Sequence, residues 1–123
     1  GTSTLTYSGQ TGVQLTPYLT ATTLDFPASF ASVDNAASSA NGGFAIIHVP
    51  INTMSGGVTT YKVQHSANDV SWADLITFST VAAATTTSEL KAVSGTVNRY
   101  IRCTATTAAS SGALTTMVSF ARF

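Results

Sequence analysis

Charged side chains are scarce in this sequence: aspartate, glutamate, lysine and arginine together make up 8% of its 123 residues. The usual share is about 25%. Five basic and five acidic residues give a formal net charge of zero, and the basic residues form no cluster. Because phosphate backbones are bound by clustered lysine and arginine, nucleic acid is not expected as a partner. The absence of long-range repulsion also permits close self-association.

Cysteine is nearly absent as well, and the single residue, Cys103, cannot form a disulfide within the chain. Its place in the alternating stretch Val97–Thr104 predicts a small buried side chain, not a catalytic thiol. The sequence also lacks Gly-x-Ser-x-Gly, the nucleophile turn of many hydrolases. We therefore predict no catalytic residues and no enzymatic activity.

Metal ligands are equally few. The soft candidates are His48, His65 and Cys103, and they lie on different expected strands. The acidic group made by Asn68-Asp69 and Asp74 is too thin for calcium, and turn formation explains it better. We predict neither a metal nor a cofactor.

No apolar run of 18 residues occurs, so no membrane span and no membrane partner are expected. The first residues, Gly1 to Thr4, lack the charged start and apolar centre of a signal peptide. Gly1 is the residue that remains when an initiator methionine is trimmed. These features predict a chain made and used in a cytoplasm.

Helical periodicity is almost missing, and short β-prone stretches separated by turn residues fill the chain instead. The pattern predicts an all-β, antiparallel two-sheet β-sandwich of about eight strands. We expect one domain over residues 1–123, with residues 1–10 as a candidate extended arm. The expected strands are Ser3–Ser8, Val13–Leu19, Phe30–Val33, Phe44–Val49, Thr60–Ser66, Trp72–Phe78, Glu89–Val93, Arg99–Thr104 and Leu114–Phe123.

Two of these stretches are the most informative. Phe44–Val49 is apolar at both alternating positions, which predicts a central strand ended by Pro50 and by the turn Met54–Gly57. Thr60–Ser66 alternates cleanly between apolar and polar residues, which predicts a strand with one solvated face. Asn68-Asp69 then predicts a hairpin turn, since both residue types tolerate left-handed backbone conformations.

A longer pattern connects these elements. Tyr61–Ser66 reads Tyr-Lys-Val-Gln-His-Ser, Trp72 follows the turn, Asn98–Arg102 reads Asn-Arg-Tyr-Ile-Arg, and Val118–Phe123 closes with Phe-Ala-Arg-Phe. This arrangement resembles the discoidin-like jelly roll, and more closely a group of small bacteriophage virion proteins. The resemblance covers about half of the chain. Asn68-Asp69 stands where the group usually has Asp-Gly, and the disulfide and lipid-inserting loops of discoidins have no counterpart.

The resemblance implies a jelly-roll sandwich that is a structural part of a phage virion, most simply a capsid decoration (cement) protein. It implies as partners the major capsid protein or another virion protein, a homo-oligomer (dimer or trimer), and a place in a virion assembled in the host cytoplasm. A tail-tube or tail-surface module is the nearest alternative. A carbohydrate-binding β-sandwich is an alternative from another class.

Aromatic residues in the first third are the candidate interface residues: Tyr7, Tyr18, Phe26 and Phe30. Tyrosine and phenylalanine are enriched at protein interfaces, which favours docking on a neighbouring subunit. Packing across one end of the sandwich explains the same residues equally well.

Trp72 and the arginines have two interpretations each. Trp72 fits a core anchor better than a sugar-stacking platform. Arg99 and Arg102 fit structural ion pairs with Asp69, Asp74 or Glu89 better than capture of a ligand.

Overall fold

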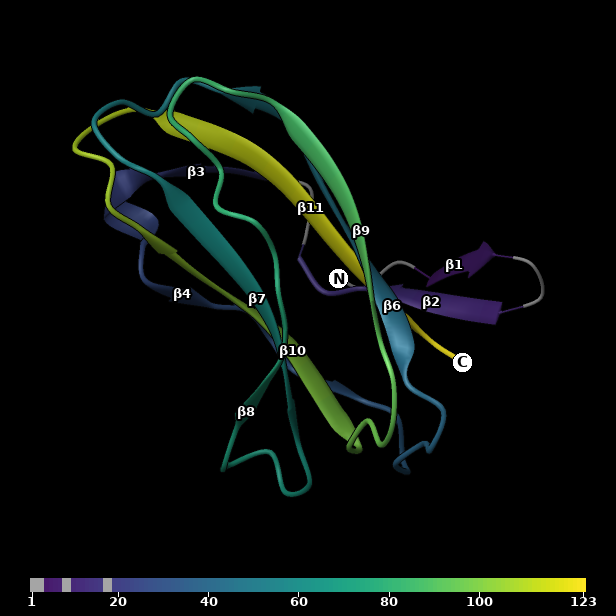
Figure 1. Ribbon diagram of the computed structural model, residues 1–123. Coiled ribbons are helices and arrows are strands. Elements are labelled where there is room, and N and C mark those ends of the chain that lie inside the picture. The colour runs from purple at the N-terminus through teal and green to yellow at the C-terminus, as the bar shows by residue number, and fades with distance from the viewer. Residues whose placement is uncertain (1–3, 8–9, 17–18) are drawn as a thin grey trace.

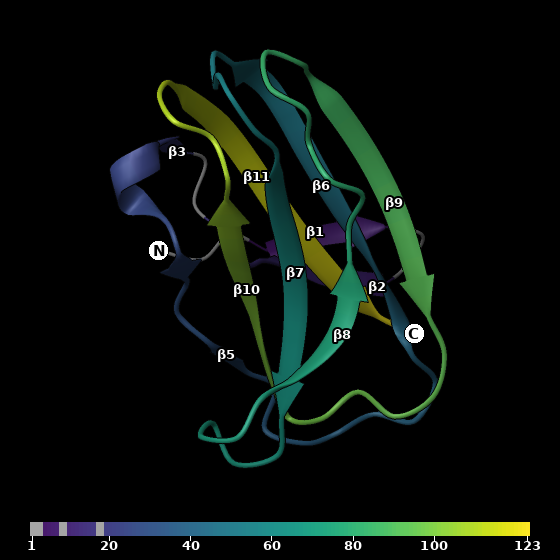
Figure 2. The same cartoon turned by 60° about the vertical axis from the view of Figure 1, so that its left-hand side comes forward.

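The computed structural model describes residues 4–7, 10–16 and 19–123, and its regular structure consists of strands and one short 3-10 helix, η1 (Thr23–Asp25). Two antiparallel sheets are stacked face to face, as Figures 1 and 2 show from two sides. The first sheet contains β1 (Thr4–Tyr7), β2 (Gln10–Gln14), β3 (Leu19–Thr22), β6 (Gly43–Asn52), β9 (Thr87–Val93) and β11 (Ala113–Arg122). The second contains β4 (Ala28–Ser29), β5 (Val33–Asp34), β7 (Thr59–Ser66), β8 (Ala73–Thr77) and β10 (Tyr100–Thr107).

The strand order identifies the topology as a jelly roll. Strands β2 and β3 both pair with β11, and strands β4 and β5 both pair with β10. Each of these two pairs therefore counts as one strand position in its sheet. The first sheet then runs β2/β3, β11, β6, β9, with β1 outside β2, and the second runs β4/β5, β10, β7, β8. Between these positions the chain crosses to the other sheet at every connection except the β7–β8 hairpin. This is an eight-position jelly roll, and the predicted fold class is confirmed.

Alternating side chains from both sheets fill the space between them. Neighbouring positions on a strand point to opposite faces, so each strand gives every second residue to the core. Burial raises the pKa of Tyr61, in the middle of β7, to about 12. The inward residues include Ala45, Ile47 and Val49 on β6, Tyr61 and Val63 on β7, Ile101, Cys103 and Ala105 on β10, and Leu114, Val118 and Phe120 on β11.

The expected central strand is confirmed, because β6 lies between β11 and β9. The expectation that Pro50 ends this strand is wrong, since β6 continues to Asn52. Pairing with β9 stops at Val49, and the register with β11 shifts between Thr115 and Met117. Proline has no N–H group to donate to a neighbouring strand. A residue in a β-bulge does not need to donate one, so the strand can continue through Pro50.

The expected strand Val13–Leu19 is divided in the structure. The backbone N–H groups of Leu15 and Thr16 both donate to the carbonyl of Val118, at 2.8 and 3.3 Å, so the ladder gains a residue there. The hydroxyl of buried Thr16 accepts from the Val118 N–H at 2.9 Å and takes the place of a backbone acceptor. The chain therefore leaves β11 after β2 and returns to it as β3.

The expected strand Phe30–Val33 is also wrong in its bounds. β4 ends before Phe30 and β5 begins at Val33, and both pair with β10. The Phe30 N–H still donates to the Cys103 carbonyl at 3.0 Å, which holds the segment between the two short strands against the sheet. The segment Phe30–Val33 therefore has the amino-acid composition of a strand, but it lacks the continuous backbone hydrogen bonds of one.

Residues 4–7 and 10–14 form the β1–β2 hairpin, with Tyr7 opposite Gln10. Figure 1 shows this hairpin projecting beside the start of β6, close to the C-terminus. The candidate arm at residues 1–10 thus contains one strand of a hairpin, and residues 1–3 and 8–9 lie outside the described part.

Candidate docking surface

The outward face of the second sheet carries a group of linked polar side chains, which includes three of the ten charged residues, Lys62, Asp74 and Arg102. Gln64 on β7 lies opposite Arg102 on β10, and Lys62 lies opposite Thr104. Their inward neighbours, such as Val63 and Cys103, are fully buried. The alternation predicted for Thr60–Ser66 is confirmed as far as Gln64, but it breaks at the end of the strand, where His65 is half-buried and Ser66, expected on the solvated face, is buried.

Three polar contacts link neighbouring strands across this face. Lys62 Nζ donates to Asp74 Oδ2 at 3.0 Å, and Gln64 Nε2 donates to Asp74 Oδ1 at 2.9 Å. Arg102 Nε donates to Gln64 Oε1 at 3.0 Å. The hydrogen bonds from Gln64 and Lys62 lower the pKa of Asp74, so this carboxylate is ionised at neutral pH. The result is a continuous network from β8 across β7 to β10.

Trp72 lies beside this network and not in the core. Its side chain is half-buried, and the Arg102 guanidinium carbon lies 4.2 Å from its ring centre. The interpretation of Trp72 as a core anchor is therefore wrong. A guanidinium at this distance is attracted by the negative face of the indole, which holds Arg102 in place from a second side.

A groove with a volume of about 310 Å³ runs along this face between β7, β10 and the segment before β4. No aromatic ring lines it. Its cationic side chains are Lys62 and Arg102, and most of the rest carry hydroxyl, amide or small apolar groups. The lining residues are Pro27, Ala28, Ser29, Thr60, Lys62, Gln64, Arg102, Thr104, Ala105 and Thr106.

Two of the predicted interface residues, Phe26 and Phe30, flank one wall of this groove without lining it. Phe26 and Phe30 are half-buried and pack against the core, and the Phe26 ring meets Tyr61 edge to face, with centres 6.4 Å apart. They anchor the segment whose intervening residues, Pro27, Ala28 and Ser29, form the wall. Tyr18 and the side chain of Tyr7 lie outside the described residues, so their role at an interface stays a prediction.

Arg99 forms an ion pair, but with a partner that the sequence did not indicate. Its Nε and Nη2 donate to the two carboxylate oxygens of Asp34, at 2.7 and 2.8 Å. The expected pairs with Asp69, Asp74 or Glu89 are wrong, since β5 lies beside β10 and brings Asp34 opposite Tyr100. Glu89 instead accepts from the backbone and hydroxyl of Ser79.

The ion pair between Arg99 and Asp34 predicts that Asp34 has an unusually low pKa, which can be measured. The hydrogen bond from Arg99, together with one from the Ala36 N–H, lowers the pKa of Asp34 from 3.8 to about 2. Because the folded-state pKa is depressed, the pair stabilises the fold above about pH 4 and this contribution is lost as the pH falls towards 2. We expect carboxyl-carbon NMR to show Asp34 titrating near pH 2 and, in Arg99→Gln, closer to 3.8. An Asp34 that titrates near 3.8 in the unaltered protein would contradict the pairing.

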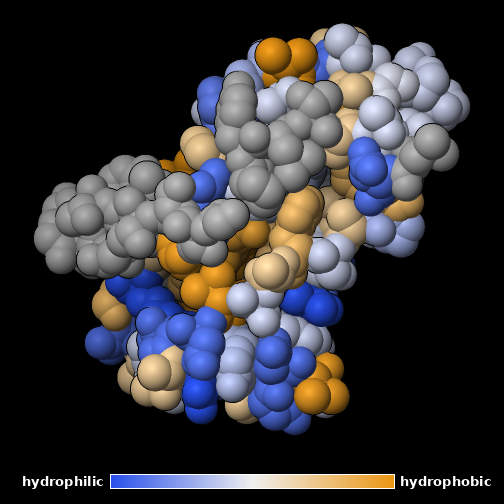
Figure 3. All heavy atoms as spheres, turned by 180° about the vertical axis from the view of Figure 1, so that it is seen from behind, coloured by the Kyte–Doolittle hydropathy of each residue, from blue (hydrophilic) through white to orange (hydrophobic). Residues whose placement is uncertain are grey.

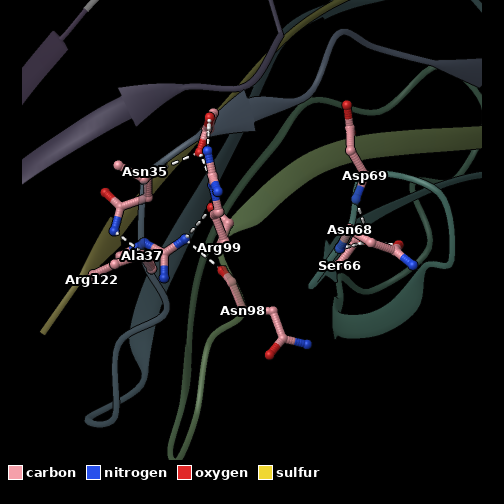
Figure 4. A network of polar contacts seen from close by, with 10 residues as sticks. Asn35, Ala37, Ser66, Asn68, Asp69, Asn98, Arg99 and Arg122 are labelled. Carbon is pink, nitrogen blue, oxygen red and sulfur yellow. Dashed lines mark hydrogen bonds and ion pairs between the residues drawn. The ribbon is translucent and has the colours of Figure 1, made fainter.

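At one end of the sandwich Arg122 ties the last strand to the loop before β10. Its Nη2 donates to the carbonyls of Asn98 and Arg99, at 2.7 and 3.2 Å, and its Nη1 donates to Ser39 and Val97. Figure 4 shows Arg122 reaching these carbonyls beside the β7–β8 turn. In that turn Asp69 has the predicted left-handed conformation, with φ of 62°.

The residues considered for metal binding are separated in the fold. His48 is exposed on β6, and Cys103 is buried on β10, where burial raises the pKa of its thiol. The Nδ1 atom of His65 accepts from the Asn98 N–H at 3.0 Å, so this histidine has a backbone partner. Among the described residues, no three His, Cys, Asp or Glu side chains come together, and no helix is long and apolar enough to cross a membrane.

Comparisons with known proteins give structural likeness only. No protein-family model matches the sequence, and no curated protein matches it. Two similar solved structures are those of infectious bursal disease virus strains Gt and Gx, at 15% and 12% identity and TM-scores of 0.45 and 0.41. They cover 99% and 98% of this chain. A third is a mutant VP2 protein of the same virus, from derived T=1 particles, at 19% identity and a TM-score of 0.35, covering 99% of this chain.

The chain spans only 31 to 32% of the length of those viral chains. All three neighbours are structures from one virus, and the third is a protein that forms particles. None of the three is a phage decoration protein, and the role of this chain is a proposal.

Proposed function

We propose that this protein is a structural part of a bacteriophage virion, and specifically a capsid decoration protein that binds the assembled shell and stabilises it. The resemblance of Tyr61–Phe123 to small phage virion proteins supports this proposal, and so does the jelly roll in which those residues lie. The protein acts by contact and not by catalysis.

The outward face of the second sheet is the observation that carries the proposal. It combines a groove with side chains that are fixed by one another, on strands whose other face is locked into the core. Such a surface loses little conformational freedom when a partner covers it, because its side chains are already ordered. Rigid, pre-ordered contact surfaces suit a protein that must add to a finished shell without rearranging.

Apolar side chains at the surface add to the area available for contact. Figure 3 shows apolar residues gathered in the middle of the face seen from behind, with hydrophilic residues towards its lower end. With a formal net charge of zero, many copies can sit close together without repulsion. Among the residues whose burial the structure describes, the exposed large hydrophobic ones belong to several different elements: Ile51, Val58, Val70, Leu90 and Phe123.

A carbohydrate-binding role is less well supported by the geometry. Sugar platforms use open aromatic rings, whereas Arg102 lies over the ring of Trp72, and Arg99 lies 5.0 Å from the ring centre of Tyr100. A tail-surface module would present the same kind of contact surface, and binding to isolated tails separates it from shell decoration.

Co-sedimentation with purified empty shells tests the proposal. We expect the protein to pellet with shells that lack it, to saturate at a fixed number of copies per shell, and to raise the temperature at which the shells break. Many weak contacts on a symmetric shell add up through avidity, so binding is expected to be cooperative if the protein is a dimer or trimer.

Isolated tails and shells that already carry the protein are the matched controls. Binding to tails alone would replace decoration with the tail alternative. Failure to bind shells, tails or whole particles would contradict a virion role.

A further inference from the structure

We propose that the groove on the outward face of the second sheet binds one carboxylate side chain, an Asp or Glu of the shell protein, with the Arg102 guanidinium as its main contact. This inference rests on the proposed function, because it names the chemistry of the partner at that surface. Four observations lead to it: the partners of the basic residues, the fixed position of Arg102, the local charge, and the composition of the groove.

Arg102 differs from the other basic residues in what it binds. All five lie in the described part of the chain, and three of the other four have an acidic partner or several acceptors, while Lys91 donates to a single carbonyl. Arg99 pairs with both oxygens of Asp34, Lys62 with Asp74, Lys91 with the Thr77 carbonyl, and Arg122 with three carbonyls and a hydroxyl. Among the described residues, Arg102 uses only Nε, and its two terminal nitrogens have no acceptor.

The Arg102 side chain is nevertheless held in position. Gln64 accepts from its Nε at 3.0 Å, and Gln64 is itself fixed by Asp74 at 2.9 Å. The ring of Trp72 supports the guanidinium from another side, at 4.2 Å. A fork that is ordered in advance loses little entropy when it binds a carboxylate, and its geometry suits two parallel hydrogen bonds. This arrangement is expected of an arginine that binds a ligand, because a surface arginine that only contacts water does not need contacts that fix its side chain.

The local charge indicates one anionic group and not several. Asp74 neutralises Lys62, with their charged atoms 3.0 Å apart, so Arg102 supplies the single excess positive charge in the groove. The volume of about 310 Å³ lies at the lower end of the range for ligand sites and suits one or two side chains.

The remaining lining completes the site for a peptide segment. Hydroxyl groups of Ser29, Thr60, Thr104 and Thr106 can bond to the backbone next to the bound carboxylate. Pro27 and Ala28 offer apolar contact to its methylene groups. An aromatic stacking surface, which a sugar would use, is absent from the lining.

Arg102→Gln tests the inference in the shell-binding assay. Since charge-assisted, two-pronged hydrogen bonds are roughly twice as strong as neutral ones, we expect the Kd per site to rise about tenfold or more. Lys91→Gln removes the same charge from the other sheet and is expected to change the Kd less than about twofold. Equal binding by Arg102→Gln and the unaltered protein would overturn the inference and leave the proposed function standing.

Thr104→Glu provides a second variant in case Arg102→Gln is unstable. It places a carboxylate in the groove between Arg102, two residues along β10, and Lys62, directly opposite on β7, so it is expected to cancel the excess positive charge and to weaken shell binding by a similar factor. Thermal unfolding of each variant checks that the fold is kept. Undiminished binding by folded Thr104→Glu would also count against the inference. Absence of binding by the unaltered protein would instead defeat the proposed function itself.

Chemical cross-linking identifies the source of the carboxylate. Arg102→Lys keeps the charge and introduces an amine, which a carbodiimide joins to a nearby carboxylate as an amide. On decorated shells, we expect mass spectrometry to find residue 102 linked to one Asp or Glu of the shell protein. A link to an acidic sugar, or no link from a variant that still binds, would overturn the assignment.

Discussion

Replacing Leu114 by alanine is expected to lower the free energy of unfolding by about 2–5 kcal/mol. Leu114 is 1% exposed and belongs to the core shared by both sheets. It lies on β11, between Ala21 of β3 and Asn52 of β6, so neighbouring strands restrict how far the backbone can collapse around a cavity. The loss therefore includes both the transfer of the leucine methyl groups and the cost of the void. Urea unfolding followed by fluorescence of Trp72 measures it.

Leu90→Ala is the matched control, because it deletes the same atoms from the surface of β9. Leu90 is 61% exposed, and its change is expected to cost about 0.5 kcal/mol or less. Similar losses for the two variants would show that Leu90 is covered in solution, for instance by a second copy of the chain. Little loss for both would contradict the position of Leu114 in the core.

The strands that could be predicted from the sequence are those with one clear burial period. Thr60–Ser66 alternates between apolar and polar residues, and β7 was found within one residue of its expected bounds. The last strand was found as closely in its bounds, but it is buried on both faces, because Thr115, Ser119 and Ala121 are buried as well as Leu114, Thr116, Val118 and Phe120. Where a strand has one wet and one dry face, the side-chain period alone fixes its register towards the core.

The bounds that could not be predicted depend on neighbours in space. Pro50 indicates the end of a strand in any local window, but the bulge opposite Thr116 allows the chain to continue. Thr16 looks like an ordinary strand residue, yet its hydroxyl bonds to Val118, far along the chain, and marks the break between β2 and β3. The continuation of β6 through Pro50 and the break at Thr16 both depend on which strand is the neighbour in the sheet, and local sequence patterns do not identify that neighbour.

Only some residues of the candidate docking surface could be predicted from the sequence. Arg99 and Arg102 were noted as possible ligand or ion-pair residues, but Asp34, the partner of Arg99, is 65 positions away. The wall made by Pro27, Ala28 and Ser29 has no signal of its own, since its place beside β10 follows from the jelly-roll topology. The aromatic residues Phe26 and Phe30 are conspicuous in the sequence, but it is the small residues between them that line the groove.

The second large effect is expected at Gly42, just before β6. Its backbone has φ of +73°, and a β-carbon built there would collide with the carbonyl of Val93, on the neighbouring strand. Gly42→Ala therefore needs a movement of the β6–β9 pair at its end, in addition to the strain of a left-handed alanine. We expect a loss of at least about 3 kcal/mol, or failure to fold, measured by urea unfolding.

Gly95→Ala separates the two causes. Gly95 has φ of +87°, but nothing lies within 4 Å of the position that its β-carbon would take. Gly95→Ala is therefore expected to lower the free energy of unfolding only by the cost of a left-handed alanine backbone, about 1–2 kcal/mol. Since both glycines lie in loops at the ends of β6 and β9, the difference between the two losses reports how closely these strands approach. If the two variants lose the same stability, the backbone of Val93 is not in contact with Gly42, and the pairing of Gly43 with Val93 that starts the β6–β9 ladder is wrong.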